Sequence, residues 1–458
     1  MEVFWDTVKD FLFLSLFLII AIILKSKIKF FQRFLIPTAI IGGFIGLILG
    51  SEVLKLIKIS PDSLGKLVYH LMAIGFIALA LKDRKGSRNR DNVNTGFIIV
   101  STYLAQGILG FIVSLAFTYT IFPNLFPPFG LLLPLGFGQG PGQAYSIGSS
   151  WEEIGLINGG NIGLSIATIG FLWAIIFGIP LLNYLVRRKK RLGLDIGDQA
   201  SKKTINDIAE KHTGTVPKKM FIDNLTVQLV LIGFVYLLTY FTLKGISILL
   251  EPLGTYGNTV ANLFWGFHFV VATMIAILVR IILNILKKKN WLHINYPDNY
   301  ILQRVSASSF DYMIVAAIAA ISIVTFRENW IPITIITTLG GLFTIIYAIY
   351  ISKRVYKRYV LEHIVALYGM LTGTITTGVA LLREIDPDSK SNVAENIVIG
   401  SAVALPLGIP LMFILGLAVT GYSANKPILY LYSLLIFIAY LAVLLFILLR
   451  RRKKSSKQ

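Results

Sequence analysis

Two stretches of this sequence combine glycine-rich backbone with small polar side chains. The first, residues 136–153, reads GFGQGPGQAYSIGSSWEE, and the second, residues 361–388, reads LEHIVALYGMLTGTITTGVALLREIDPD. Hydroxyls and side-chain amides can hold a carboxylate or complete a shell of oxygens around Na⁺, but they offer nothing for acid–base chemistry. Where a helix is broken, N–H groups at a helix start bind anions and carbonyls at a helix end bind cations. The residue types therefore predict binding of a small polar ligand.

The candidate substrate ligands lie around the expected break in each stretch. In the first stretch they are Gly138, Gln139, Gly140, Gly142, Gln143 and Ser146. In the second they are Thr372, Gly373, Thr374, Thr376, Thr377 and Arg383. Arginine is a natural partner for a carboxylate, and the alternative for Arg383 is a cytoplasmic anchor paired with Glu384 or Asp386. The alternative for the other residues is helix packing, with threonines bonded to their own helix.

Three further polar residues are candidate ion ligands. Asn161 and Asn396 each lie near the start of the apolar run that follows a glycine-rich stretch, and Asp311 lies within an apolar run. The alternative for the asparagines is interhelical hydrogen bonding, and for Asp311 it is capping of a broken helix. The five histidines form no HExxH pair and the sequence contains no GxSxG, so we do not expect an enzyme or a bound transition metal.

The composition is that of a membrane protein. The chain has 458 residues, of which 55% are hydrophobic and 14% charged, and its mean hydropathy is +0.73. Soluble domains carry about 25% charged residues. The net charge of +20 comes from basic residues in short loops between apolar runs, a placement that favours a membrane orientation signal over nucleic-acid binding. The absence of cysteine excludes disulfides, thiolate metal sites and cysteine nucleophiles.

Eleven apolar runs are candidate membrane spans. They cover residues 11–24, 34–50, 64–81, 95–121, 158–186, 224–243, 258–286, 301–325, 331–352, 393–420 and 428–449. The two glycine-rich stretches, at about 125–150 and 361–384, are apolar but interrupted and belong to none of these runs.

The loop charges predict the orientation of the chain. Basic clusters follow the first, third, fifth, seventh and ninth runs, and a further cluster forms the C-terminal tail. Under the positive-inside rule this alternation places the N-terminus outside the cell membrane and the C-terminus in the cytoplasm. The assignment requires each interrupted stretch to return to the side from which it enters.

The chain divides into two halves with the same order of segments. Residues 1–186 contain five runs, with the stretch 125–150 between the fourth and fifth. Residues 224–420 contain five more, with the stretch 361–384 between the last two. Because each half has an odd number of spans, the second half is inverted relative to the first. Paired broken segments in inverted repeats indicate the binding site of a secondary transporter.

The remaining residues connect and extend these halves. Residues 187–223 are a polar cytoplasmic linker, and residues 421–458 add one span and a basic cytoplasmic tail. Each interrupted stretch is too short to cross the bilayer twice at about 1.5 Å per residue, so we predict a re-entrant hairpin. The expected fold is an all-α polytopic membrane protein with two inverted five-helix repeats, each with one hairpin, plus one C-terminal helix.

Three segments carry a family resemblance. The three segments are IPTAIIGGFIGLILG, LPLGFGQGPGQAYSIGSSWE and GMLTGTITTGVALLREIDPD. Together they resemble the bacterial sodium/glutamate symporter family, and the resemblance runs through most of the chain. It implies a homodimer in which each protomer has a scaffold and a mobile transport domain, with substrate carried by an elevator movement coupled to Na⁺. The family's hairpin-tip role falls on Gly136–Gly142 and Thr372–Gly378. The first tip, GFGQGPGQA, differs from the GGHGTA-like tip of the family's glutamate transporters.

The expected function is Na⁺-coupled symport of glutamate or a related small carboxylate or amino acid. Its partners would be the anionic substrate, Na⁺, the lipid bilayer and a second copy of the chain, with no cofactor and no nucleic acid. Two alternatives of similar architecture are a hydroxycarboxylate symporter and an amino-acid exchanger. A channel is a further alternative, because hairpin loops also build selectivity filters, although inverted repeats favour alternating access.

Overall fold

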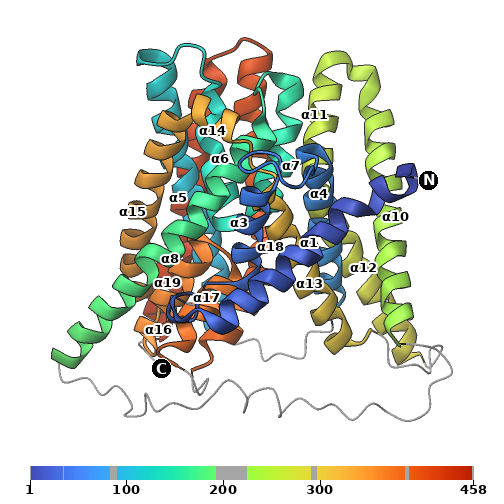
Figure 1. Ribbon diagram of the computed structural model, residues 1–458. Helices are drawn as coiled ribbons and strands as arrows, with labels where there is room; N and C mark the ends of the chain where they lie inside the picture. Colours follow the sequence, from blue (N-terminus) through green and yellow to red (C-terminus); the bar gives the residue numbers. More distant parts are fainter. Residues whose placement is uncertain are drawn as a thin grey trace.

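The regular structure is helical throughout the residues that the structure describes. The computed structural model describes residues 2–34, 36–82, 90–191, 224–289, 297–386 and 391–455 (Figure 1). Eight helices in this part of the chain are long and apolar enough to cross a membrane. The prediction of an all-α polytopic membrane protein is therefore confirmed. The predicted linker begins inside helix α8, and its residues 192–223 lie outside the described residues.

Each predicted span overlaps a helix, and two of the spans are divided between two helices. The main helices are α1 (Glu2–Lys27), α3 (Thr38–Leu49), α4 (Pro61–Leu81), α5 (Arg90–Thr120), α8 (Gly159–Arg191), α10 (Asn224–Leu250), α12 (His268–Lys288), α13 (Asn299–Ala319), α15 (Trp330–Val355), α18 (Val393–Ser423) and α19 (Ile428–Ser455). Shorter elements between them are α2 (Lys29–Arg33), η5 (Glu251–Leu253), α11 (Gly254–Gly266) and α14 (Ile323–Glu328).

Three of the expected spans fall outside the eight long apolar helices. The apolar part of α1 is confined between Asp10 and Lys25, and α13 carries Arg304 and Asp311. The helix α3 has only 12 residues, or about 18 Å at 1.5 Å per residue, against a hydrocarbon core of about 30 Å. About half of the residues of α3 and α13 are buried within the protein, whereas the apolar part of α1 exposes Leu16, Ile19 and Ile22.

The seventh run, predicted as one helix over 258–286, is divided at Phe267 into α11 and α12. Side chains from other elements satisfy carbonyls at the break. The Ser146 hydroxyl donates to the Gly266 carbonyl at 2.6 Å, and the Tyr69 hydroxyl donates to the Trp265 carbonyl at 2.9 Å. Such partners replace the N–H groups that a continuous helix would supply, which a count of apolar residues does not reveal.

The eighth run, predicted over 301–325, is divided as well. The helix α13 ends at Ala319, and Ser322 then caps the short helix α14 by accepting from the Thr325 N–H at 3.4 Å. Serine competes for backbone hydrogen bonds and favours a helix start over a helix interior. The prediction of one continuous span here was therefore wrong.

Each glycine-rich stretch folds as two arms separated by a break. The first hairpin (127–150) consists of η1 (Pro127–Leu131), α6 (Leu132–Pro134) and η2 (Leu135–Gln139), followed by α7 (Pro141–Ser150). The second hairpin (Val360–Arg383) consists of α16 (Val360–Thr372) and α17 (Ile375–Arg383). Figure 1 shows α6 and α7 in the upper half of the molecule and α16 and α17 at its lower end, beside the C-terminus.

The helices associate in two groups. In the first, α4 packs along α13, α3 packs on α13, α12 packs on α4, and α1 and α10 lie on α3 and α12. We call these helices, with α11, the α4–α13 group. In the second, α18, α15 and α19 surround α5, and α8 packs on both hairpins. We call these helices and the two hairpins the hairpin group. Figure 1 shows α10 at one side of the molecule and α15 at the other.

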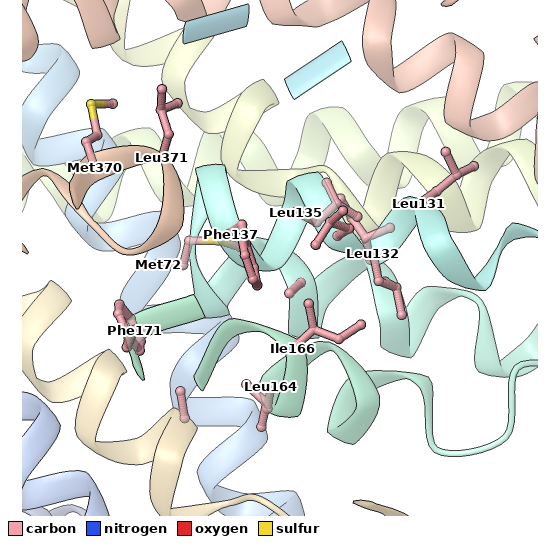
Figure 2. Close-up of a cluster of buried hydrophobic side chains, with 14 of the residues drawn as sticks. Met72, Leu131, Leu132, Leu135, Phe137, Leu164, Ile166, Phe171, Met370 and Leu371 are labelled. Atoms are coloured by element: carbon pink, nitrogen blue, oxygen red, sulfur yellow. The ribbon is translucent and has the colours of Figure 1, made fainter. Parts of the chain in front are cut away.

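The first arm of the first hairpin lies in the largest hydrophobic cluster. Leu135 and Phe137 are fully buried there with Ile166 and Phe171 of α8 and with Leu371 of α16 (Figure 2). A buried apolar arm tolerates irregular backbone because protein, not lipid, covers it. The cluster therefore fixes the first hairpin against α8 and the second hairpin.

Glycine permits the closest approach in this packing. A Cβ built on Gly130 would lie 1.8 Å from the carbonyl oxygen of Gly110, and one built on Gly110 would lie 2.1 Å from that of Gly130. The backbones of η1 and α5 are therefore in direct contact, as small residues allow between membrane helices.

We expect Gly130→Ala to destabilise the protein, because the new methyl group forces α5 and η1 apart. Overpacking of this kind costs about 1–3 kcal/mol, which a thermal melt of the detergent-purified protein would register as a drop of several degrees. The matched control is Gly233→Ala in α10, where a Cβ would meet nothing within 4 Å. That control should melt at or above the wild-type temperature, since alanine favours helix. Equal melting temperatures for the two variants would contradict the close packing.

Candidate functional site

The first hairpin is broken by a glycine followed by a proline. Gly140 has φ 96° and ψ 175°, a conformation that only glycine adopts without strain. Pro141 then occupies the first position of α7, where its missing N–H costs nothing because that group has no helical partner. The arm that precedes the break ends at Gln139 in a wide π-helical turn. The sequence Gly140–Pro141 therefore ends one short helix and begins the next.

The second hairpin is broken at Gly373 and Thr374. The helix α16 ends at Thr372, and the Thr374 hydroxyl caps α17 by accepting from the Thr377 N–H at 3.4 Å. Glycine also lets the two arms pack closely, since a Cβ on Gly378 would lie 2.4 Å from the Ala366 carbonyl. The predicted tip thus contains a real interruption, with a helix end on one side and a helix start on the other.

The two tips line one cavity of about 180 Å³. Its walls divide between the two helix groups. The α4–α13 group contributes only apolar side chains: Met72, Phe76, Leu79, Phe267, Phe269, Val270, Phe310, Met313 and Ile314. The hairpin group contributes every polar side chain: Tyr103, Gln139, Gln143, Thr374, Thr376 and Ser401. The hairpin group also contributes apolar side chains, among them Met370, Ile375, Leu405 and Met412, so the cavity has one wholly apolar wall and one mixed wall that holds all its polar side chains, which we call the polar wall.

Two helix starts face this cavity. The first-turn residues Gly142 and Gln143 of α7 and Ile375 and Thr376 of α17 all line it. The first N–H groups of a helix lack intrahelical partners and lie at its positive end. Among the described residues no Asp, Glu, Lys, Arg or His lines the cavity, so these helix starts are its source of positive potential. The arrangement suits a ligand with two anionic groups.

Gln143 adds an unpaired acceptor to the polar wall. Its side chain is only 5% exposed, and its Oε1 atom has no hydrogen-bond partner in the part of the chain that the structure describes. A buried polar atom without a partner costs about 1–3 kcal/mol. The amide oxygen is therefore arranged for a donor that a ligand brings. Gln139, the other glutamine at this tip, is partly exposed.

Most of the predicted substrate ligands meet at this cavity. Gly138, Gln139, Gly140, Gly142, Gln143, Gly373, Thr374 and Thr376 line it. Thr372, Thr377 and Ser146 are buried nearby with other roles: Thr372 donates to the Tyr368 carbonyl at 2.8 Å, and Ser146 supports the break at Gly266. Arg383 lies exposed at the end of α17 and does not line the cavity.

The three predicted ion ligands lie elsewhere. The Asn161 side-chain oxygen accepts from the Ser322 N–H at 3.3 Å, between α13 and α14. Asn396 and the Nε2 atom of His363 are 3.1 Å apart, which ties α18 to the second hairpin. Asp311 is exposed on α13. In this conformation the two asparagines make interhelical hydrogen bonds, and none of the three lines the cavity.

Sequence reasoning missed Tyr103, Ser401 and the apolar wall. Tyr103 lies in the segment STYLAQG of α5, where Ser101, Thr102 and Gln106 are fully buried. A cluster of buried polar residues inside a membrane helix signals function, and this one could have been found. The apolar wall has no such signal, because its methionines and phenylalanines resemble ordinary core residues.

Comparison with known families agrees with this geometry. A model of the sodium/glutamate symporter family matches residues 3–383, from α1 to the end of the second hairpin. No curated protein and no solved structure matches the chain. The matched segment contains both hairpin tips and most of the cavity wall, and it spans well over half of the sequence. The chain therefore belongs to the sodium/glutamate symporter family, which implies Na⁺-coupled glutamate transport.

Proposed function

We propose that this protein binds glutamate in the cavity between the hairpin tips and carries it across the membrane with Na⁺. The observation that carries the proposal is the meeting of two helix starts, α7 and α17, at one small cavity that contains an unpaired amide oxygen. Glutamate has two carboxylates and one ammonium group. The N–H groups of α7 and α17 bind one carboxylate each, and the Gln143 Oε1 atom accepts from the ammonium group.

The two walls of the cavity support an elevator movement. The polar groups that hold the substrate all belong to the hairpin group, whereas the facing wall on the α4–α13 group is apolar. The hairpin group can slide along such a wall without breaking substrate hydrogen bonds. The packing of the helices agrees with inverted repeats, since α3 packs on α13 as α12 packs on α4, and α1 packs on α3 as α10 packs on α12.

We further propose the orientation and assembly that the loop charges and the family imply. Basic residues occupy the last turns of α1, α12 and α15. These turns face the cytoplasm under the positive-inside rule, so the N-terminus lies outside the cell membrane and the first hairpin enters from outside. The second hairpin enters from the cytoplasm. The protein acts as a homodimer, with the α4–α13 group as scaffold.

We expect substrate to protect the second tip from chemical modification. Thr376→Cys places a thiol on the cavity wall of a protein that otherwise has no cysteine. Glutamate with Na⁺ should slow its reaction with a small polar thiol reagent, and glutamate with K⁺ should not. Arg383→Cys is the control, because that side chain is exposed outside the cavity. The labelling rate of this control should not depend on glutamate. Protection at position 383 but not at 376 would place the site elsewhere.

We expect a disulfide between the two helix groups to stop transport. A Cβ on Gly266 of α11 would lie 3.1 Å from the Cβ of Ser150 in the first hairpin, close to the roughly 3.5–4.5 Å of disulfides. Oxidation of the double variant Ser150→Cys/Gly266→Cys should abolish Na⁺-driven glutamate uptake into liposomes, and a reductant should restore it.

The matched control for this experiment joins two elements of one group. A Cβ on Gly421 of α18 would lie 3.2 Å from the Cβ of Leu429 in α19, and its nearest neighbours are side-chain atoms. Oxidised Gly421→Cys/Leu429→Cys should therefore keep its uptake. Continued uptake in the oxidised Ser150→Cys/Gly266→Cys protein would rule out relative movement at this contact. Absence of uptake by the wild type under an inward Na⁺ gradient would refute the proposed function itself.

We expect Gln143→Leu to impair recognition of the amino group alone. A hydrogen bond to a charged group contributes about 1.5–3 kcal/mol, so the half-saturating glutamate concentration should rise about tenfold or more. Inhibition by glutarate, which has both carboxylates and no amino group, should not weaken. Ser401→Ala is the control, because its hydroxyl already donates to the Ile397 carbonyl at 2.7 Å. An equal loss of apparent affinity for glutamate and for glutarate would show that Gln143 does not bind the amino group.

A further inference from the structure

Gln106 lies in α5 beneath both hairpin tips and is completely buried. Its Nε2 atom donates to the Thr344 hydroxyl oxygen at 2.9 Å and to the Leu371 carbonyl at 3.0 Å. These bonds join α5 to α15 and to the end of α16. The side chain thus connects the centre of the hairpin group with the second tip, although it does not line the substrate cavity.

The two partners of Gln106 determine which way its amide points. The Leu371 carbonyl can only accept, and the Thr344 hydroxyl uses its proton on the Gly340 carbonyl at 2.6 Å. The amide nitrogen must therefore face both. The Oε1 atom then occupies the other branch of the amide, and it has no hydrogen-bond partner among the described residues. Burial of such an oxygen without a partner costs about 1–3 kcal/mol.

The surroundings of this oxygen offer acceptors rather than donors. A Cβ built on Gly138 would lie 3.3 Å from the Gln106 Oε1 atom, so this atom lies against the first tip. The Gly138 carbonyl accepts from the Tyr103 hydroxyl at 2.9 Å and keeps a second lone pair. Gly138 and Leu371 lie in the last turns of η2 and α16. The carbonyls of a last turn receive no hydrogen bond from an N–H group of their own helix, and the helix dipole is negative there.

We propose that the Gln106 Oε1 atom, with the carbonyls of Gly138 and Leu371, forms the binding site of a coupling Na⁺. These ligands are neutral oxygens, which suit a hard monovalent cation. A divalent cation would need carboxylates, and the described residues contain no cluster of acidic or histidine side chains that could hold one. The proposal rests on the proposed function, since it assigns the site of the ion that drives it.

A cation at this position accounts for coupling. It contacts the last turn of each first arm, at Gly138 and Leu371, while the substrate contacts the first turn of each second arm, at α7 and α17. Na⁺ therefore draws together the two tips between which the substrate binds. Loss of the ion leaves the negative ends of η2 and α16 facing each other without a counter-charge, which opposes the geometry that the substrate needs.

The test measures Na⁺ binding without substrate. The melting temperature of the full-length protein in detergent is titrated with NaCl at constant ionic strength, with choline as the replacement cation. Wild type should be stabilised by Na⁺. In Gln106→Leu the half-saturating Na⁺ concentration should rise about tenfold or more, the range seen when a metal site loses a supporting group. Gln106→Asn keeps an amide but has a shorter side chain, which withdraws the oxygen from the site. Its half-saturating Na⁺ concentration should also rise, and this variant replaces Gln106→Leu if the leucine variant does not fold.

The control is Thr344→Val, which removes one acceptor of the Gln106 amide and leaves its oxygen in place. Its half-saturating Na⁺ concentration should stay near that of wild type. Wild-type Na⁺ dependence in Gln106→Leu or Gln106→Asn, or no Na⁺ effect on wild type, would overturn the assignment. Failure of the proposed function is distinguishable, because it appears as absent glutamate uptake by the wild type.

Discussion

The structure depends on one constraint: backbone groups freed by a break in a membrane helix must find partners inside the protein. Water is absent from the bilayer core, and each unpaired group costs several kcal/mol there. This chain breaks helices at both hairpin tips and again at Phe267. Hydroxyls of Tyr103, Ser146 and Thr374 serve the freed groups. Freed backbone groups that receive no hydrogen bond from a side chain are the ones available to bind ligands.

The separation of polar and apolar walls follows from this constraint. The backbone groups freed at the two tips belong to the hairpin group, which also contains side chains that satisfy them. The α4–α13 group is broken at Phe267, where the Trp265 and Gly266 carbonyls accept from the Tyr69 and Ser146 hydroxyls, and its side chains at the cavity are all apolar. Methionine is flexible and fills irregular gaps, so the same wall can remain in contact with a moving surface. In the elevator movement that we propose, substrate affinity and mobility thus belong to different residues.

Sequence reasoning succeeded where composition controls structure. Apolar run length predicted the helices, and glycine with proline predicted the break at Gly140 and Pro141, because glycine tolerates a positive φ and proline favours the first position of a helix. It failed at Phe267, where the break depends on hydroxyls that come from Tyr69 and Ser146. Arg383 shows the same limit, since its distance from the cavity follows from the length of α17 and not from its own chemistry. Contacts between residues far apart in the chain remain invisible to patterns within it.

Among the described residues, no Asp, Glu, His, Lys or Arg side chain lines the cavity, and this has a consequence for acidity. The positive ends of α7 and α17 arise from peptide dipoles, which do not gain or lose protons. The attraction that this wall exerts on an anion is therefore the same in acid and at neutral pH. Any change of affinity with pH at this wall belongs to the protons of the substrate, so the protein selects an ionic form of its ligand without changing its own.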